Sequence, residues 1–97
     1  MRFEIILAPE AIEDLKRLKA AARARVLDRL ESHLRHEPTR VSRSRIKRLR
    51  GVRRPQYRLR LDDVRVFYDI RAKTVEILAI LSKTDAGSWL DKIGEPE

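Results

Sequence analysis

The sequence predicts an α+β fold: an antiparallel four-stranded sheet with an N-terminal helical hairpin and a short C-terminal helix. Two stretches near the N-terminus repeat apolar residues at helical spacing, and a later stretch alternates apolar and charged residues with period two. A near-continuous apolar run, residues 74–81, is typical of a strand buried on both faces. Helices and strands that stay in separate parts of a chain favour an α+β fold. The 97 residues are expected to form a single domain, residues 1–97.

The N-terminal part is predicted to form one strand and two helices. Residues 2–7 alternate weakly and are expected to form the first strand. Pro9 suits the first position of a helix, because its missing N–H needs no partner there. A second helix is expected from about residue 21 to residue 35, and Pro38 ends it. The apolar residues expected to face the core are Phe3, Ile5 and Leu7 in the strand, Ile12, Leu15 and Leu18 in the first helix, and Val26, Leu27, Leu30 and Leu34 in the second.

The stretch from Pro55 to Ile70 predicts a β-hairpin. Apolar residues alternate with other residues on both sides of the Asp62-Asp63 pair, and aspartate tolerates the backbone geometry of a turn. Successive side chains of a strand point to opposite faces, so Arg58 and Arg60 are expected to share one open face, about 7 Å apart. Arg65, on the returning strand, is expected to join them. Three guanidinium groups on one face repel one another, and this arrangement favours a site for an anion.

The segments that flank the hairpin are less regular. Residues 41–51 are expected to form a mostly extended connection, held to the sheet by Ile46 and Leu49. A short helix is expected after the last strand, with Thr84 or Asp85 as its N-cap. The remaining expectations for this end of the chain are a buried helix face formed by Trp89, Leu90 and Ile93, a helix end at Gly94 and a frayed tail, Glu95-Pro96-Glu97.

The positive charge is concentrated in one third of the chain. The net charge is +8, but the residues from Arg40 to Arg71 hold twelve Lys and Arg against three Asp, which leaves the rest of the chain at −1. This concentration predicts a polyanionic partner: nucleic acid, a ribosome or an acidic protein segment. The residues expected to bind RNA are Arg43, Arg45, Lys47, Arg48, Arg50, Arg53 and Arg54, with Phe67 as a ring on which a base can stack.

The sequence lacks residues that several functional classes need. The chain has no cysteine, and its apolar opening is too short for a signal peptide, so we expect a cytoplasmic protein without membrane contact. His33 and His36 lie three residues apart on the second predicted helix, but no third ligand accompanies them. We therefore expect both histidines to be exposed, and we predict neither a metal nor a cofactor. Tyr57 and Tyr68 are expected to point into the core with their strand neighbours.

The hairpin resembles the central signature of the RelE/ParE superfamily, the toxin halves of type II toxin–antitoxin pairs. Two segments carry the resemblance: Gln-Tyr-Arg-Leu-Arg-Leu at 56–61 and Val-Arg-Val-Phe-Tyr-Asp-Ile at 64–70. The expected order of helices and strands is also that of RelE-like folds, so the resemblance extends over nearly the whole chain. It implies a RelE-like fold, a cognate antitoxin as partner and binding of operator DNA through the antitoxin complex.

The resemblance to RelE implies a ribosome-dependent mRNA endoribonuclease that inhibits translation, with the ribosome and mRNA as partners. Toxins of this type help a 2′-OH attack the adjacent phosphate. The implied catalytic residues are Arg58 and Arg60, which fall where RelE has two lysines, Arg65, which matches an arginine of the next strand, and Lys83, close to a basic residue after the last strand. The catalytic tyrosine of RelE has no counterpart, because no tyrosine follows Tyr68.

Two other functions and one structural explanation stay open. A ParE-like protein inhibits DNA gyrase on the same fold without nuclease activity, and the missing tyrosine and the lysine-to-arginine changes favour this alternative. A non-catalytic RNA-binding module would bind RNA through the same cationic residues without cleaving it. The arginines can also be ordinary solvated side chains that keep a sheet edge from aggregating.

Overall fold

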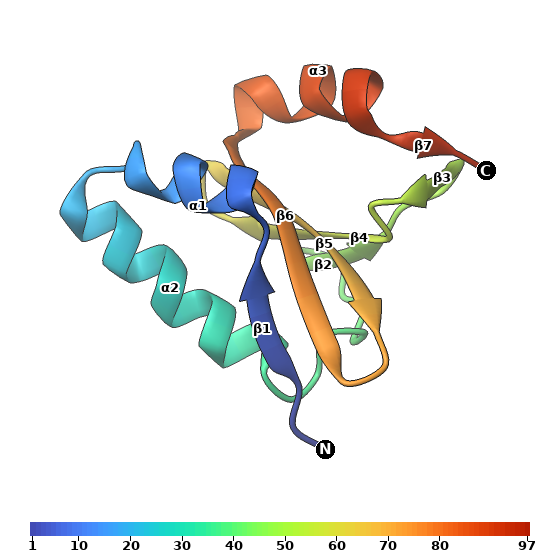
Figure 1. Ribbon diagram of the computed structural model, residues 1–97, viewed down its shortest axis with the longest axis horizontal. Helices are drawn as coiled ribbons and strands as arrows, with labels where there is room; N and C mark the ends of the chain where they lie inside the picture. The colour runs from blue at the N-terminus through green and yellow to red at the C-terminus, as the bar shows by residue number, and fades with distance from the viewer.

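The computed structural model describes all 97 residues and has an α+β fold (Figure 1). Three helices accompany a five-stranded mixed sheet and a small two-stranded one. No helix combines the length and the apolar character needed to cross a membrane. The elements are β1 (Glu4–Leu7), α1 (Pro9–Lys16), α2 (Ala20–Leu34), β2 (Ile46–Arg48), β3 (Val52–Arg54), β4 (Tyr57–Leu61), β5 (Val64–Arg71), β6 (Thr74–Ser82), α3 (Lys83–Ile93) and β7 (Glu95–Pro96).

The main sheet differs from the predicted antiparallel four-stranded one. Its order is β1-β6-β5-β4-β2, and β1 runs parallel to β6 while the other pairs are antiparallel. The fifth strand, β2, arises because Ile46–Arg48 pairs with β4 along the edge of the sheet. The predicted antiparallel direction of β1 was wrong. Its partner β6 is the last strand of the main sheet in chain order, and the long connection between the two allows either orientation.

The C-terminal tail is ordered by a second, smaller sheet. Glu95–Pro96 forms β7, which pairs with β3, so the predicted frayed tail is wrong. The start of α3 also differs from the prediction, because its N-cap is Ser82, whose Oγ accepts the N–H of Asp85 at 3.2 Å. Strand β6 therefore passes directly into α3, and the helix ends at Gly94 as predicted.

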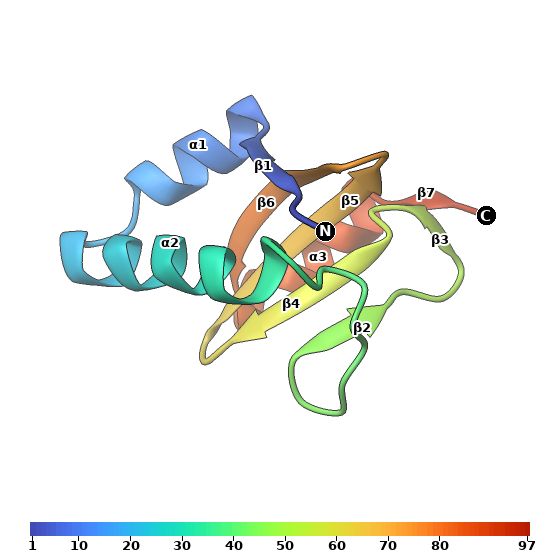
Figure 2. The same cartoon turned by 90° about the horizontal axis from the view of Figure 1, so that it is seen from below.

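Helices cover both faces of the sheet (Figures 1 and 2). The larger core lies between α1, α2 and the sheet, and includes Leu30, Leu34, Leu59 and Tyr68. The smaller core lies under α3. Three residues predicted to be buried are exposed instead, because each lies outside the face by which its helix contacts the sheet: Ile12 is 42% exposed, Leu27 40% and Ile93 54%.

Tyr68 links the sheet to the segment that follows α2. Its side chain is fully buried, and its hydroxyl donates a hydrogen bond to the carbonyl oxygen of Pro38 at 2.6 Å. Tyr57 stacks on it with 5.4 Å between ring centroids. Burial, together with the neighbouring Tyr57, raises the pKa of Tyr68 well above its usual range. Both tyrosines pack in or against the larger core, as the strand alternation predicted.

Replacing Tyr68 by phenylalanine is expected to lower the free energy of unfolding by about 1–3 kcal/mol, because the buried carbonyl of Pro38 loses its donor. Urea unfolding followed by circular dichroism measures the change. The matched control is Tyr57→Phe, whose hydroxyl takes part in no hydrogen bond within the protein and whose loss is expected to change stability by less than about 0.5 kcal/mol. Equal unfolding midpoints for Tyr68→Phe and the wild type would contradict the prediction.

Candidate functional site

Four cationic side chains lie on the face of the sheet that carries α3. The register of β4 and β5 places Arg60 opposite Arg65, and the register of β2 and β4 places Lys47 opposite Arg58. We call Lys47, Arg58, Arg60 and Arg65 the basic face. The structure therefore brings the three predicted arginines together, because the alternation along the hairpin places them on one side. Their chemical role stays a prediction.

Lys47 also belongs to the basic face, although the sequence placed it only among the basic residues that precede the hairpin. Its position opposite Arg58 depends on Ile46–Arg48 being a strand. The one sequence signal for that strand is Ile46, a single apolar residue among basic and small polar ones. One residue is too little to establish a period-two pattern.

The charge of the basic face is not neutralised within the chain. None of its four residues forms an ion pair, since all the ion pairs lie elsewhere. Burial lowers the pKa of Arg58, and the charges of Arg65 and Arg60 lower it further. Burial and the charge of Arg60 also lower the pKa of Arg65, while Asp63 opposes the shift. In addition, Arg58 Nε is buried without a hydrogen-bond partner. Such a group of cations favours an anion as its ligand.

The hairpin turn fixes the direction of Arg65. Its Nη1 donates to the carbonyl oxygens of Asp62, at 2.7 Å, and Val64, at 3.1 Å. Lys83, the first residue of α3, lies at the same turn, because its backbone N–H donates to the carbonyl oxygen of Asp63 at 2.7 Å. The side chain of Lys83 is exposed. The predicted fourth cation therefore lies at the end of the sheet that carries Arg60 and Arg65.

Phe67 does not offer the exposed ring that the sequence predicted. It lies on the same face as the arginines, but it is only 2% exposed. Trp89 of α3 stacks on it with 4.9 Å between ring centroids. The prediction that Phe67 stacks on a base is wrong for this structure, because α3 covers the ring.

The rest of the basic run divides into two groups. Arg43, Arg45, Arg48 and Arg50 lie along β2 and in the loops beside it, where Arg43 and Arg50 are exposed. Arg48 lies over the ring of Tyr57, 5.3 Å from its centroid, and donates to the carbonyl oxygen of Gln56. These side chains extend the cationic surface along the edge strand of the sheet.

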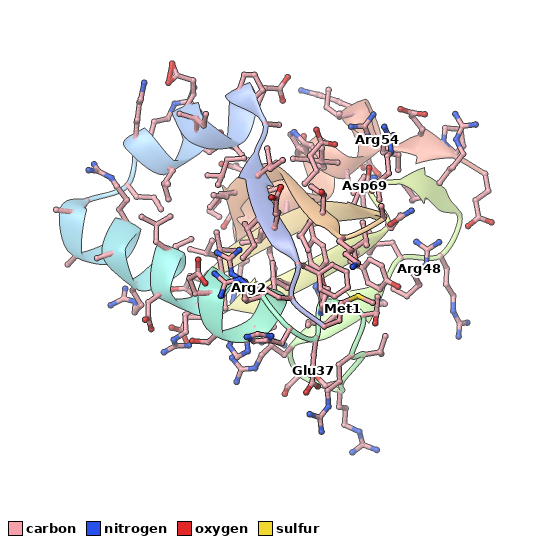
Figure 3. All side chains as sticks on the ribbon, turned by 60° about the horizontal axis from the view of Figure 1, so that its bottom comes forward. Met1, Arg2, Glu37, Arg48, Arg54 and Asp69 are labelled. Carbon is pink, nitrogen blue, oxygen red and sulfur yellow. The ribbon has the colours of Figure 1, made fainter.

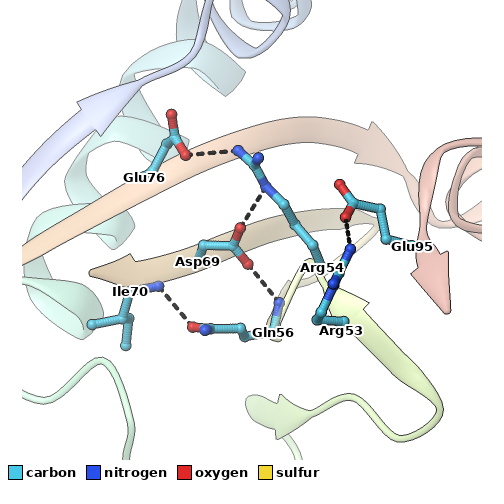
Figure 4. A network of polar contacts seen from close by, with 7 residues as sticks. All are labelled: Arg53, Arg54, Gln56, Asp69, Ile70, Glu76 and Glu95. Carbon is cyan, nitrogen blue, oxygen red and sulfur yellow. Dashed lines mark hydrogen bonds and ion pairs between the residues drawn. The ribbon is translucent and has the colours of Figure 1, made fainter. Parts of the chain in front are cut away.

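Arg53 and Arg54 are engaged within the protein (Figure 4). Arg53 pairs with Glu95 at 2.7 Å, while Arg54 contacts Asp69 at 2.7 Å and Glu76 at 2.9 Å. Each arginine thus has a carboxylate partner within the chain, while the Arg53 side chain stays 72% exposed. That these two arginines bind RNA stays a prediction. Sequence reasoning missed the network because its acidic members are distant in the chain.

Comparison with known families and structures agrees with this architecture. Residues 5–87 match the family model described as the ParE toxin of the type II toxin–antitoxin system parDE. The match covers the α1–α2 hairpin, the basic face and the start of α3. A search of curated proteins gives no significant match.

Three solved structures with a similar fold are complexes of a toxin with its antitoxin. The chain is similar to a chain of the RelBE2 toxin–antitoxin complex from Mycobacterium tuberculosis, with 25% identity, a TM-score of 0.65 and coverage of 84% of this chain and 99% of that one. It is also similar to a chain of the archaeal RelE–RelB complex from Pyrococcus horikoshii, with 26% identity, a TM-score of 0.69 and coverage of 86% and 97%. A chain of the RelB–RelE complex from Methanococcus jannaschii shares the fold, with 17% identity, a TM-score of 0.62 and coverage of 87% and 96%. The chain belongs to the ParE toxin family, within the RelE/ParE superfamily of type II toxin–antitoxin toxins.

Proposed function

We propose that this toxin is a ribosome-dependent endoribonuclease that cleaves mRNA and thereby inhibits translation, with the basic face binding the scissile phosphate. The observation that carries the proposal is the unneutralised group of Arg58, Arg60 and Arg65 on one face of the sheet. Cations that are already in place where negative charge develops supply a large part of the rate enhancement in many enzymes.

The proposed reaction is a transfer within the RNA. The 2′-oxygen of a ribose attacks the adjacent phosphorus, the bond from phosphorus to the 5′-oxygen of the next nucleotide breaks, and the products are a 2′,3′-cyclic phosphate and a 5′-hydroxyl. Arg58 and Arg60 contact the phosphate oxygens, and Arg65, held by the turn, stabilises the charge that develops on them. Lys83, from its place beside the same turn, donates a proton to the leaving 5′-oxygen and so completes the 5′-hydroxyl.

The proposed dependence on the ribosome follows from what the basic face lacks. An arginine side chain keeps its proton at neutral pH, so it is a poor acceptor for the proton of the 2′-hydroxyl. The face holds neither a histidine nor a tyrosine. The ribosome then positions the mRNA for in-line attack, and the 2′-hydroxyl proton passes to a group of the ribosome or to solvent.

The same surface is the proposed target of an antitoxin. Two of the structures similar to this chain, at 25% and 26% identity, are complexes of a toxin with its antitoxin. A segment that neutralises a cationic face must carry acidic residues, so we propose that the cognate antitoxin covers the basic face with an acidic segment. Binding of operator DNA is assigned to the toxin–antitoxin complex, through the antitoxin.

A second candidate function is inhibition of DNA gyrase without cleavage of RNA. The match to the ParE family model favours it, as does the absence of a tyrosine after Tyr68. A ParE-like inhibitor needs no proton transfer, so it explains a basic face made only of arginine and lysine. Fold alone does not decide between the two targets.

Primer extension on mRNA in a purified translation reaction tests the proposal. The wild-type protein is expected to produce cuts at defined positions when ribosomes are present and to leave the same mRNA intact when they are omitted. A parallel assay measures supercoiling of relaxed plasmid by gyrase, which is expected to proceed unchanged. Intact mRNA on ribosomes at high toxin concentration would overturn the nuclease, and a block of supercoiling would then assign the gyrase function. RNA binding with neither effect would leave a non-catalytic binding module.

A further inference from the structure

A polar hollow lies beyond the edge of the sheet, where the end of α2 meets the loop before β2. Its volume is about 510 Å³. Figure 3 shows Glu37 and Met1 at this end of the molecule. The hollow contains none of the proposed catalytic residues Arg58, Arg60, Arg65 and Lys83. The eight residues that line it are Ser32, His33, His36, Glu37, Arg40, Ser42, Arg45 and Ile46.

The central contact in the hollow joins a histidine to an arginine. His33 Nε2 lies 3.2 Å from Arg45 Nη1. A guanidinium group can only donate hydrogen bonds, so Nε2 must be the unprotonated acceptor and His33 is neutral in this state. Burial lowers the pKa of His33, and the charges of Arg45 and Arg29 lower it further. Protonation of His33 would break this hydrogen bond and bring two positive groups together.

The other groups around His33 leave the hollow cationic. Glu37 pairs with Arg40 at 2.9 Å, so these two charges compensate each other. His36 Nδ1 lies 3.4 Å from the carbonyl oxygen of Met1, and its ring is exposed. Ser42 Oγ accepts the backbone N–H of Arg45 at 3.1 Å, which holds the residue that contacts His33. The uncompensated cations near His33 are therefore Arg45, which contacts its ring, and Arg29, which is on the same helix.

The hollow lies on the opposite side of the sheet from the basic face, across the β2–β4 edge. The backbone N–H of Arg60 donates to the carbonyl oxygen of Arg45 at 2.8 Å, so the two arginines are neighbours across the β2–β4 edge. Arg60 lies on the α3 side of the sheet, whereas the side chain of Arg45 reaches His33 of α2, which lies on the other side. An RNA strand that contacts both Arg60 and Arg45 must therefore pass around this edge of the sheet.

We propose that this hollow binds a backbone phosphate of RNA between His33 and Arg45, and that His33 takes up a proton as the phosphate enters. The site extends the proposed RNA-binding function to a second position. A phosphate oxygen accepts hydrogen bonds from both groups and removes the repulsion between them, so the ring that is a neutral acceptor in the free protein becomes a charged donor in the complex. An acidic protein segment carries the same sign of charge as RNA, so it is a separate outcome of the test below.

The proposal predicts that RNA affinity rises as the pH falls. Because bound phosphate raises the affinity of His33 for a proton, protonation of His33 must raise the affinity for phosphate by the same factor. The wild type is expected to bind RNA about three- to tenfold more tightly at pH 5.5 than at pH 7, which corresponds to a bound-state pKa about one unit above that of the free protein. The chain has only two histidines, so few other groups change charge in this interval.

Fluorescence anisotropy with a labelled single-stranded oligoribonucleotide measures this affinity for the full chain at both pH values, without ribosomes. His33→Gln, whose amide oxygen can still accept from Arg45 but cannot titrate, is expected to lose the gain at pH 5.5, so that its affinity is the same at the two pH values. The matched control is His36→Gln, which removes the second histidine of the hollow and is expected to keep the gain. NMR titration of the His33 ring is expected to show a higher pKa in the presence of the oligoribonucleotide.

Several results would overturn the assignment. They are equal affinity of the wild type at the two pH values, a pH dependence that persists in His33→Gln, and a His33 resonance that RNA leaves unchanged. Inorganic phosphate or a polyglutamate peptide that shifts the resonance when RNA does not would reassign the hollow to a free anion or an acidic segment. The readout is binding without ribosomes, so a failure of the cleavage proposal would not change it.

Discussion

Replacing Arg65 by alanine is expected to slow ribosome-dependent mRNA cleavage by about 100- to 1,000-fold, the loss typical when one fixed donor to a developing negative charge is removed. Arg65 is the member of the basic face whose guanidinium is held by two backbone carbonyls of the hairpin turn. In the proposed reaction it would therefore contact the phosphate without having to be ordered first. Arg65→Lys keeps the positive charge, but its ammonium group lacks the planar fork of N–H donors with which arginine can bond the turn carbonyls and the phosphate together. We therefore expect this variant to recover only part of the rate.

The matched control is Arg71→Ala. Arg71 ends the same strand, is exposed and lies far along β5 from the hairpin turn, so its replacement removes the same charge from the other end of the sheet. Single-turnover cleavage of ribosome-bound mRNA is expected to change by less than about threefold, because salt screens an exposed charge at that separation. Arg65→Ala cutting at the wild-type rate would contradict the role of Arg65. An equal loss in both variants would show that only the net charge matters.

The hairpin could be predicted from the sequence because its signal is local. Period-two alternation identified β4 and β5, and their pairing then followed, so the grouping of Arg58, Arg60 and Arg65 needed no other part of the chain. The same reasoning placed Tyr57 and Tyr68 inward. Strand alternation decides on which face of the sheet a side chain lies. For these residues, the face alone determines whether the side chain joins the core or the cationic group.

Alternation does not say what covers a face, and this explains the error at Phe67. The ring lies on the predicted side, but Trp89 covers it, and Trp89 reaches it only because Ser82 starts α3 at the end of β6. Arg54 is a similar case. Its sequence neighbours are basic, whereas its partners Asp69 and Glu76 come from β5 and β6. A local pattern of charge describes a potential ligand surface, but tertiary contacts decide which charges remain free.

Replacing Asp69 by alanine is expected to lower the free energy of unfolding by about 2–4 kcal/mol, because two donors lose their acceptor in a half-buried site. Asp69 Oδ2 accepts from Arg54 Nε at 2.7 Å, and Oδ1 accepts the backbone N–H of Gln56 at 2.7 Å (Figure 4). Gln56 in turn accepts the N–H of Ile70 through its side chain at 2.9 Å. The loss of Asp69 therefore disturbs the start of β4, the strand that carries Arg58 and Arg60.

Glu76→Ala is the control that separates burial from charge. Asp69 and Glu76 contact the same guanidinium, at 2.7 and 2.9 Å, but the side chain of Asp69 is 15% exposed and that of Glu76 is 42% exposed. Exposed ion pairs contribute about 0–1 kcal/mol, so Glu76→Ala is expected to cost less than about 1 kcal/mol in urea unfolding. Equal losses for the two variants would mean that the charge of Arg54 alone sets the effect. A larger loss for Asp69→Ala is expected because only Asp69 also satisfies a backbone donor at the entry to the strand that positions the proposed site.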